Sequence, residues 1–250
     1  MPTRAEMNGV GEYLMLQNVS GIKSPYDTRT RFDVDISECA SGIMGNFCRE
    51  GVPHLIGLKN DVEAEGGVFL ISDMFRDWMM QWQAWRDYDL GLKAAFSPKP
   101  GGSFHNAGRS FDVDLPELLK TMEYAKFWQI CKDHGFSSVG KNRHTPNEKA
   151  TEAWHFDFMG IFEALYKKQR YTMAAQVATM DVIGNNYPEA RQEQIKNYRI
   201  QAYLLSLGLY NSTVDGIYGD GQHRAYMDYL SGIEKNEHLD MILDSYGMVA

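Results

Sequence analysis

The spacing between His105 and Asp112 restricts how this chain can fold more than any other feature of its sequence. Both residues lie in the segment SFHNAGRSFD, residues 103–112, at an odd separation. Along one continuous strand, an odd separation places two side chains on opposite faces. They can meet only if the chain turns between them, and the Asn-Ala-Gly sequence at 106–108 is typical of a turn, with Gly108 free to adopt a positive φ. We therefore expect a turn, followed by a strand that presents both side chains on one wall.

A second segment, EAWHF, begins at Glu152 and obeys the same rule. Glu152 and His155 are again an odd number of positions apart, so a bend near Ala153 is needed to direct both into one cleft. Trp154 and Phe156 would then face the core and hold His155 by packing.

Together the two segments contain the residue types of a hydrolytic zinc site. Such a site has three protein ligands, an open position for water and a general base that does not bind the metal. Two imidazoles and one carboxylate supply the ligands here, and Glu152 is a spare carboxylate that can take a proton from water and pass it to a leaving group. Each segment alone is more often structural, but their joint occurrence favours a metal site. We expect Asp114 and Asp157 to contact a ligand side chain or the solvent rather than the metal.

The combined pattern, SxHxxG…D followed by ExWH, resembles the zinc-dependent D-alanyl-D-alanine peptidases of the VanX/VanY type, which include bacterial carboxypeptidases and phage endolysins. The resemblance covers residues 66–158 and includes an upstream S-x-x-x-R-x-x-x-x-Q segment formed by Ser72, Arg76 and Gln81. Two positions depart from the family pattern: Arg109 stands in the first motif, and Met-Phe replaces the usual Gly-Tyr at 74–75.

The resemblance implies a role for each matching residue. His105, Asp112 and His155 would bind Zn²⁺, Glu152 would be the catalytic base, and Arg76 would polarise the scissile carbonyl or orient the substrate. The residues that we expect to contact the substrate are Ser103, Gln81, Trp154 and His144.

The C-terminal part resembles a second family, the small helical peptidoglycan-binding module. The resemblance covers residues 195–230 and rests on LGLY at 207–210 and VDGIYG at 214–219. We expect Asp215 and Gly216 to form a tight turn, Ile217 and Tyr218 to pack between helices, and the next helix to start at Gly219. Asp215, Gly216 and Tyr218 are the predicted wall-binding residues. The alternative is that these residues only build a helical hairpin.

The fold expected from these patterns is α+β. Short strands are predicted at 32–36, 66–71 and 154–158, helices at 73–88 and 118–134, and helical periodicity dominates after residue 170. The resemblance adds a small antiparallel sheet with flanking helices, as in the zinc D,D-peptidases, and a C-terminal helical bundle. The predicted domains are a catalytic domain at 1–170, with no function assigned to residues 1–60, and a peptidoglycan-binding module at 171–250.

Composition excludes several other functions. The net charge is −8 and no basic run is present, so no nucleic-acid partner is expected. No apolar stretch is long enough for membrane insertion. The three cysteines, Cys39, Cys48 and Cys131, favour reduced thiols, with a Cys39–Cys48 disulfide as the alternative.

The predicted function is therefore a zinc metallopeptidase that acts on peptidoglycan as a monomer, like a phage endolysin. The N-terminus lacks the pattern of a signal peptide, so we expect synthesis in the cytoplasm and action in the periplasm or cell wall after delivery by a holin or a secretion system. The alternatives are a secreted antibacterial effector with an immunity protein, and a non-catalytic wall-binding protein. The sequence leaves open whether the bond is cut by a D,D-carboxypeptidase, a D,D-endopeptidase or an L-Ala-D-Glu endopeptidase activity.

Overall fold

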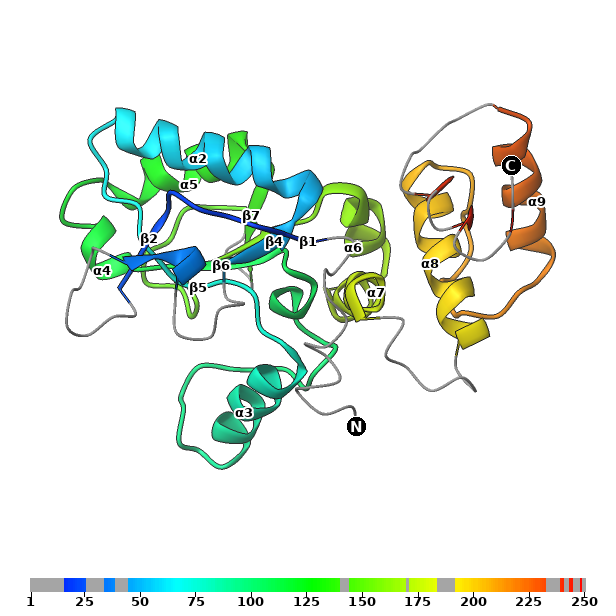
Figure 1. Ribbon diagram of the computed structural model, residues 1–250, viewed down its shortest axis with the longest axis horizontal. Coiled ribbons are helices and arrows are strands. Elements are labelled where there is room, and N and C mark those ends of the chain that lie inside the picture. Colours follow the sequence, from blue (N-terminus) through cyan, green and yellow to red (C-terminus); the bar gives the residue numbers. More distant parts are fainter. Residues whose placement is uncertain are drawn as a thin grey trace. The chain divides into compact units, whose positions relative to one another are not determined.

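The computed structural model describes residues 16–25, 34–38, 45–139, 144–169, 171–183, 192–232, 239–240, 243–244 and 248. The chain divides into two compact units, Met1–Gly160 and Ile161–Ala250 (Figure 1). This division lies close to the predicted boundary at residue 170, and the functional assignment of the two parts stays a prediction.

The first unit is an α+β structure with small antiparallel sheets and flanking helices, as predicted. Its strands are β1 (Leu16–Asn18), β2 (Lys23–Ser24), β3 (Val34–Asp35), β4 (Asn46–Cys48), β5 (Ile71–Asp73), β6 (Ser110–Val113), β7 (Phe136–Ser138) and β8 (His155–Phe158). Its helices are α2 (Val52–Ala64), α3 (Trp78–Asp89), α4 (Leu115–Leu118) and α5 (Tyr124–Asp133), with 3-10 helices η1 (Ile36–Glu38), η2 (Arg49–Gly51) and η3 (Phe104–Ala107); η4 (Gly160–Phe162) follows β8. The strands pair as β1-β4, as β2-β3 and as a four-stranded sheet of order β5-β6-β8-β7.

The four-stranded sheet has one aromatic face and one polar face, because side chains alternate along β6 and β8. Phe111 lies directly opposite Phe156, and their rings stack at 5.7 Å. Phe127 of α5 packs edge-on against Phe156 at 5.3 Å, so α5, which lies beside α2, covers this face (Figure 1). The opposite face carries Ser110 and Asp112 of β6 and the polar residues of β8, so it holds two of the predicted metal ligands, Asp112 and His155.

Several helix boundaries differ from those predicted. The helix expected at 73–88 begins at Trp78, because the Asp77 side chain accepts a hydrogen bond from Met80 N at 2.7 Å and caps the helix there. The helix expected at 118–134 begins only at Tyr124, as α5, and Leu118 ends the separate short helix α4, which is capped by Asp114. Gly135, with φ 78°, follows α5 as predicted. Helix α2 was not predicted at all.

Two strand predictions were also inexact. The strand expected at 66–71 begins at Ile71. Of the strand expected at 32–36, the described part is β3, and Ile36 already belongs to η1. Arg109, the residue of the first motif that departs from the family pattern, is buried. It forms an ion pair with Glu50, which connects the start of β6 to η2.

The second unit is helical, as predicted, with α6 (Glu163–Gln169), α7 (Tyr171–Ile183), α8 (Gln192–Ser206) and α9 (Asp220–Leu230). Asp181 of α7 accepts hydrogen bonds from Arg199 and Tyr203 of α8 at 2.6 and 2.8 Å, which joins these two helices. Gly208, with φ 74°, follows the end of α8, and Gly219 is the N-cap of α9, both as predicted.

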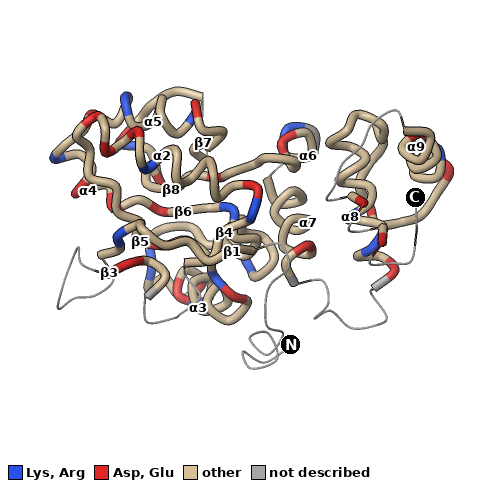
Figure 2. Tube along the Cα trace, turned by 45° about the horizontal axis from the view of Figure 1, so that its top comes forward, with Lys and Arg blue, Asp and Glu red and all other residues tan. Residues whose placement is uncertain are grey.

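No helix in the described part of the chain is both long and apolar enough to cross a membrane. Basic and acidic residues are interspersed along the described chain (Figure 2). Cys48 and Cys131 are buried free thiols, whereas Cys39 and its predicted alternative pairing lie outside the described residues.

Candidate metal centre

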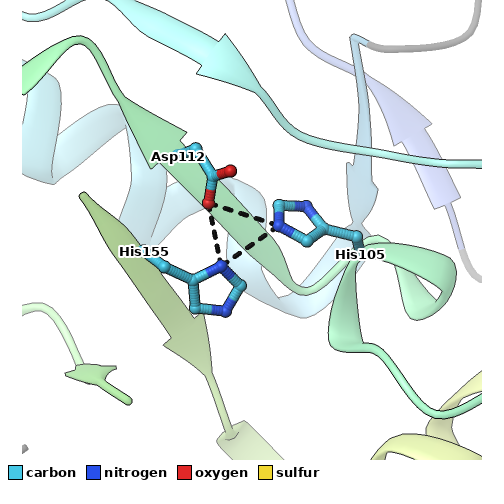
Figure 3. Close-up of side chains that lie close together, drawn as sticks. All are labelled: His105, Asp112 and His155. Carbon is cyan, nitrogen blue, oxygen red and sulfur yellow. Dashed lines mark hydrogen bonds and ion pairs between the residues drawn. The ribbon is translucent and has the colours of Figure 1, made fainter. Parts of the chain in front are cut away.

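Three short elements of the first unit bring His105, Asp112 and His155 together, from η3, β6 and β8 respectively (Figure 3). Ser103 caps η3, since its hydroxyl accepts a hydrogen bond from His105 N at 3.2 Å. Gly108 ends η3 with φ 59°, in the left-handed region that glycine favours. The predicted turn between His105 and Asp112 is therefore present, and β6 follows it.

The three side chains approach one another through one atom each. His155 Nδ1 lies 2.8 Å from Asp112 Oδ1 and 3.1 Å from His105 Nε2, and the third separation, between His105 Nε2 and Asp112 Oδ1, is 3.3 Å (Figure 3). A tetrahedral zinc ion with bonds of about 2.0–2.1 Å has ligand atoms about 3.3 Å apart. The two nitrogens and one oxygen are thus of the types zinc prefers, at separations close to one face of such a tetrahedron.

The nitrogen of each imidazole that faces away from this cluster also has a partner. His105 Nδ1 lies 2.5 Å from the backbone oxygen of Met74, and His155 Nε2 lies 2.8 Å from Asp157 Oδ1. If each of these nitrogens carries the ring proton and donates it outward, the opposite nitrogen is left with a free lone pair for a metal.

Charge interactions within the cluster are strong. Although burial opposes it, the two imidazoles hold the pKa of Asp112 well below its usual range. Burial also lowers the pKa of His155, but the carboxylates of Asp157 and Asp112 outweigh it and raise that pKa to about 10. In the absence of a metal, the site is thus held together by a protonated His155 between two carboxylates.

Glu152 stands at the turn that leads into β8. It is the one non-glycine residue of the described chain with a positive φ, at 68°, which is an unfavourable conformation for glutamate. Its carbonyl accepts a hydrogen bond from His155 N at 3.1 Å, which closes a turn with Ala153 and Trp154 at its centre, so the predicted bend near Ala153 is present. Burial raises the pKa of the half-buried Glu152 carboxyl; Asp112 and Asp157 act in the same direction, and His155 and Lys93 oppose them. A base with a raised pKa is better matched to proton transfer near neutral pH.

Arg76 lies next to the cluster, in the extended segment before α3. Its guanidinium contacts Asp73 Oδ2 at 2.6 Å and reaches to 3.5 Å from Asp112 Oδ2, the oxygen that faces away from the imidazoles. Gln81 Oε1 accepts from Arg76 Nη1 at 3.2 Å. Arg76 is therefore a fixed positive charge beside the proposed metal ligand and not a solvent-facing helix residue.

The residues expected to contact a substrate differ in how accessible their side chains are. Gln81 is fully buried and its amide nitrogen donates to Ser97 and Pro98, so it holds Arg76 and has no free surface for a ligand. Ser103 is likewise buried as the cap of η3. Trp154 is half-buried beside His155, and His144 is exposed, so the substrate role predicted for these two stays a prediction.

Three residues that shape the site, Asp73, Asn106 and Ser110, were not singled out as functional from the sequence. Asp73 holds Arg76, and the Asn106 amide nitrogen donates to the backbone oxygens of Arg76 and Asp77 at 2.7 and 3.1 Å. Ser110 donates to Asp157, and Asp157 contacts His155, so the prediction that Asp157 contacts a ligand side chain is confirmed. The alternation of SFDV was the available signal for Ser110, since it places Ser110 on the same face as Asp112.

In the second unit, the predicted wall-binding residues differ in exposure. Asp215 and the positive-φ Gly216 form the expected tight turn, and Gln201 accepts hydrogen bonds from both backbone nitrogens. Ile217 and Tyr218 are 68% and 50% exposed, so the prediction that they pack between helices is wrong. Since Gln201 and Asp215 bond the turn from within, it does not need these two side chains as packing.

No protein-family model matches the sequence, and no curated protein matches it significantly. Solved structures that are similar to parts of it include the following two. One is the vancomycin-resistance D,D-pentapeptidase VanY from a VanB-type resistance cassette, a mutant in complex with Zn(II), with 18% identity, a TM-score of 0.36, and coverage of 49% of this chain and 77% of that chain. The other is the LD-carboxypeptidase LdcB, solved in a study of peptidoglycan recognition, with 16% identity, a TM-score of 0.39, and coverage of 71% and 76%.

Proposed function

We propose that this protein is a zinc peptidase that hydrolyses amide bonds in the stem peptides or cross-links of peptidoglycan. The observation that carries the proposal is the convergence of His105 Nε2, Asp112 Oδ1 and His155 Nδ1 at 2.8–3.3 Å, with Glu152 on the adjoining turn. Zinc bound by three such ligands supplies Lewis-acid polarisation of a carbonyl and a water of lowered pKa.

Glu152 would act as the general base and then as the general acid. Its carboxylate takes a proton from the attacking water as the new C–O bond forms at the scissile carbonyl carbon. The same proton then goes to the amide nitrogen as the C–N bond breaks, which releases an amine and regenerates the carboxylate. The positive φ of Glu152 is a strained conformation, which indicates that the surrounding structure fixes this residue in the turn before β8.

Arg76 would stabilise negative charge. The oxyanion that develops at the carbonyl needs a fixed positive charge nearby, and Arg76 is held beside Asp112 by Asp73 and Gln81. Because these partners fix its guanidinium before a substrate binds, little reorganisation accompanies the reaction.

Peptidoglycan is proposed as the substrate because two parts of the sequence independently resemble proteins of the cell wall. The second unit would bind the wall polymer through exposed side chains such as Tyr218, and thereby raise the effective concentration of stem peptides near the peptidase. We further propose that the protein reaches the wall through a phage holin or a secretion machine; a neighbouring gene for a holin, or for an immunity protein, would distinguish these routes.

The decisive experiment compares wild type with Glu152→Gln on purified sacculi, with zinc content measured in parallel and the released muropeptides identified by mass spectrometry. Glu152→Gln should keep stoichiometric zinc and lose about 10²–10⁴-fold in rate, because only the proton transfer is removed. The masses of the products also identify the bond that is cut.

Glu123→Gln is the matched control, since Glu123 is exposed and its side chain makes no capping hydrogen bond at the start of α5. It should digest sacculi at the wild-type rate. A wild-type protein that binds no zinc, or a Glu152→Gln variant as active as wild type, would contradict the proposed function.

A further inference from the structure

The polar face of the four-stranded sheet carries two cross-strand pairs side by side. Asp112 lies directly opposite His155, and Ser110 lies directly opposite Asp157. Because alternate residues of a strand share a face, all four side chains point to the same side of the sheet. The proposed metal ligands account for the first pair only, and the second pair is buried immediately beside it.

His155 can bind a metal through Nδ1 only when its proton sits on Nε2. Its Nδ1 faces Asp112 and His105, while its Nε2 lies 2.8 Å from Asp157 Oδ1. A carboxylate at that position accepts the Nε2 proton and fixes both the tautomer and the ring plane.

Ser110 restrains that carboxylate in turn. Its hydroxyl donates to the same oxygen, Asp157 Oδ1, at 2.6 Å, from the opposite strand. Asp157 Oδ1 thus receives two donors, whereas its other oxygen, Oδ2, is buried without a hydrogen-bond partner among the described residues. Burying a carboxylate with one unsatisfied oxygen costs stability, so the fold gains little from an aspartate here.

The two imidazoles differ in how they are held. His105 Nδ1 bonds to the backbone oxygen of Met74, a partner that no side-chain substitution removes. The orientation of His155 depends on side chains alone. The sensitivity of the site to substitution should therefore be concentrated at Asp157 and Ser110.

We propose that Asp157 and Ser110 are positioning residues that lock His155 in its metal-binding tautomer and thereby set the zinc affinity of the site. This inference rests on the proposed function, because it takes His155 to be a zinc ligand. It concerns metal binding and not the identity of the bond that is cut.

The test measures the zinc dissociation constant of the full chain by competition with a chromophoric chelator. Asp157→Asn should weaken zinc binding by about 10–100-fold, and Ser110→Ala by at least about threefold, since it removes one restraint and leaves the acceptor. Asp133→Asn is the matched control, because Asp133 is exposed at the end of α5, and it should bind zinc like wild type. In the zinc-loaded wild type, ¹⁵N NMR of histidine should show the His155 proton on Nε2, and Asp157→Asn should broaden or shift that resonance.

The outcomes separate the two proposals. A wild type that binds no zinc overturns the proposed function together with this inference. A wild type that binds zinc, with an Asp157→Asn variant of equal affinity and unchanged His155 resonance, overturns the inference alone. If Asp157→Asn does not fold, Ser110→Ala decides: threefold or greater weakening supports the inference, and wild-type affinity contradicts it.

Discussion

The polar face of the four-stranded sheet and the turn at residues 214–219 both contain buried polar groups, but these groups are satisfied in different ways. In the turn, Gln201 uses both ends of its amide: Oε1 accepts from Asp215 N and Gly216 N, and Nε2 donates to Asp215 Oδ1 and Ile217 O. Every donor in this network meets an acceptor within the chain, so no external group is required.

On the sheet, two nitrogens and a carboxylate oxygen approach one another to 2.8–3.3 Å with at most one proton per imidazole available between them. Crowded acceptors of this kind are stabilised by a cation, whether a proton or a metal ion. The comparison shows that the number of polar residues in a region does not reveal whether the region needs a bound cation. That need arises where the lone pairs of the polar groups outnumber the protons available to them.

The largest expected effect that sharpens this comparison is at Arg76. Arg76→Ala should reduce the rate of peptide hydrolysis by about 100-fold with zinc retained, because it removes a fixed charge next to the reacting carbonyl. Arg76→Lys should recover part of the rate. Arg86→Ala is the control, since Arg86 is exposed on α3, where it lies over the Trp82 ring. A loss of zinc in Arg76→Ala would show instead that Arg76 acts by orienting Asp112.

The next largest effect tests whether the turn at residues 214–219 is held by its hydrogen bonds to Gln201. Gln201→Ala should destabilise the second unit by about 3 kcal/mol, because it leaves buried backbone donors without acceptors. All five tryptophans lie in the first unit, so their fluorescence reports that unit alone, while hydrogen exchange at residues 212–219 reports the turn. We expect faster exchange there and an unchanged fluorescence transition and zinc affinity.

Tyr218→Phe is the companion variant, since it removes only an exposed hydrogen bond to His223 and should change stability by less than about 0.5 kcal/mol. Equal exchange rates in Gln201→Ala and Tyr218→Phe would contradict the role given to Gln201.

The smallest effect concerns the metal-free sheet. The pKa of His155 is raised to about 10 in the folded protein, so its contribution to stability is complete below its unfolded pKa of about 6.5 and is lost as pH rises through about 10. The metal-free protein should melt roughly 5 °C lower at pH 10 than at pH 6.5 on this account. The zinc-loaded protein should lack this decline, because zinc takes the place of the proton on Nδ1. An equal fall in melting temperature for the metal-free and zinc-loaded forms across this pH range would contradict the role given to His155.

Much of the candidate site could be predicted from local sequence. The odd spacing of His105 and Asp112 required a turn, and Gly108 supplied the residue that forms it. The alternation in SFDV and HFDF placed the aromatic and polar side chains on opposite faces. These features depend on a few neighbouring residues, so a single sequence was sufficient to infer them.

Other features depend on contacts between distant segments and could not be inferred in this way. The cap at Asp77 moved the start of α3 and placed Arg76 outside the helix. The burial of Gln81 depends on the position of Pro98, which sequence periodicity does not report. No local pattern distinguishes a glutamate with a positive φ from any other, so the strain at Glu152 was also missed. In the second unit, the internal bonds of Gln201 left Ile217 and Tyr218 exposed where packing was expected.

The opposed pairs on β6 and β8 also bear on how the chain finds its fold. If one of these strands slipped by one residue along the other, its phenylalanine, Phe111 or Phe156, would turn toward the polar side, and both the Asp112–His155 and the Ser110–Asp157 pair would break. Zinc bound at this candidate site would therefore favour this strand register, since a shifted pairing would not gather the three ligands. The same ion that would serve hydrolysis would thus also stabilise the native strand register during folding.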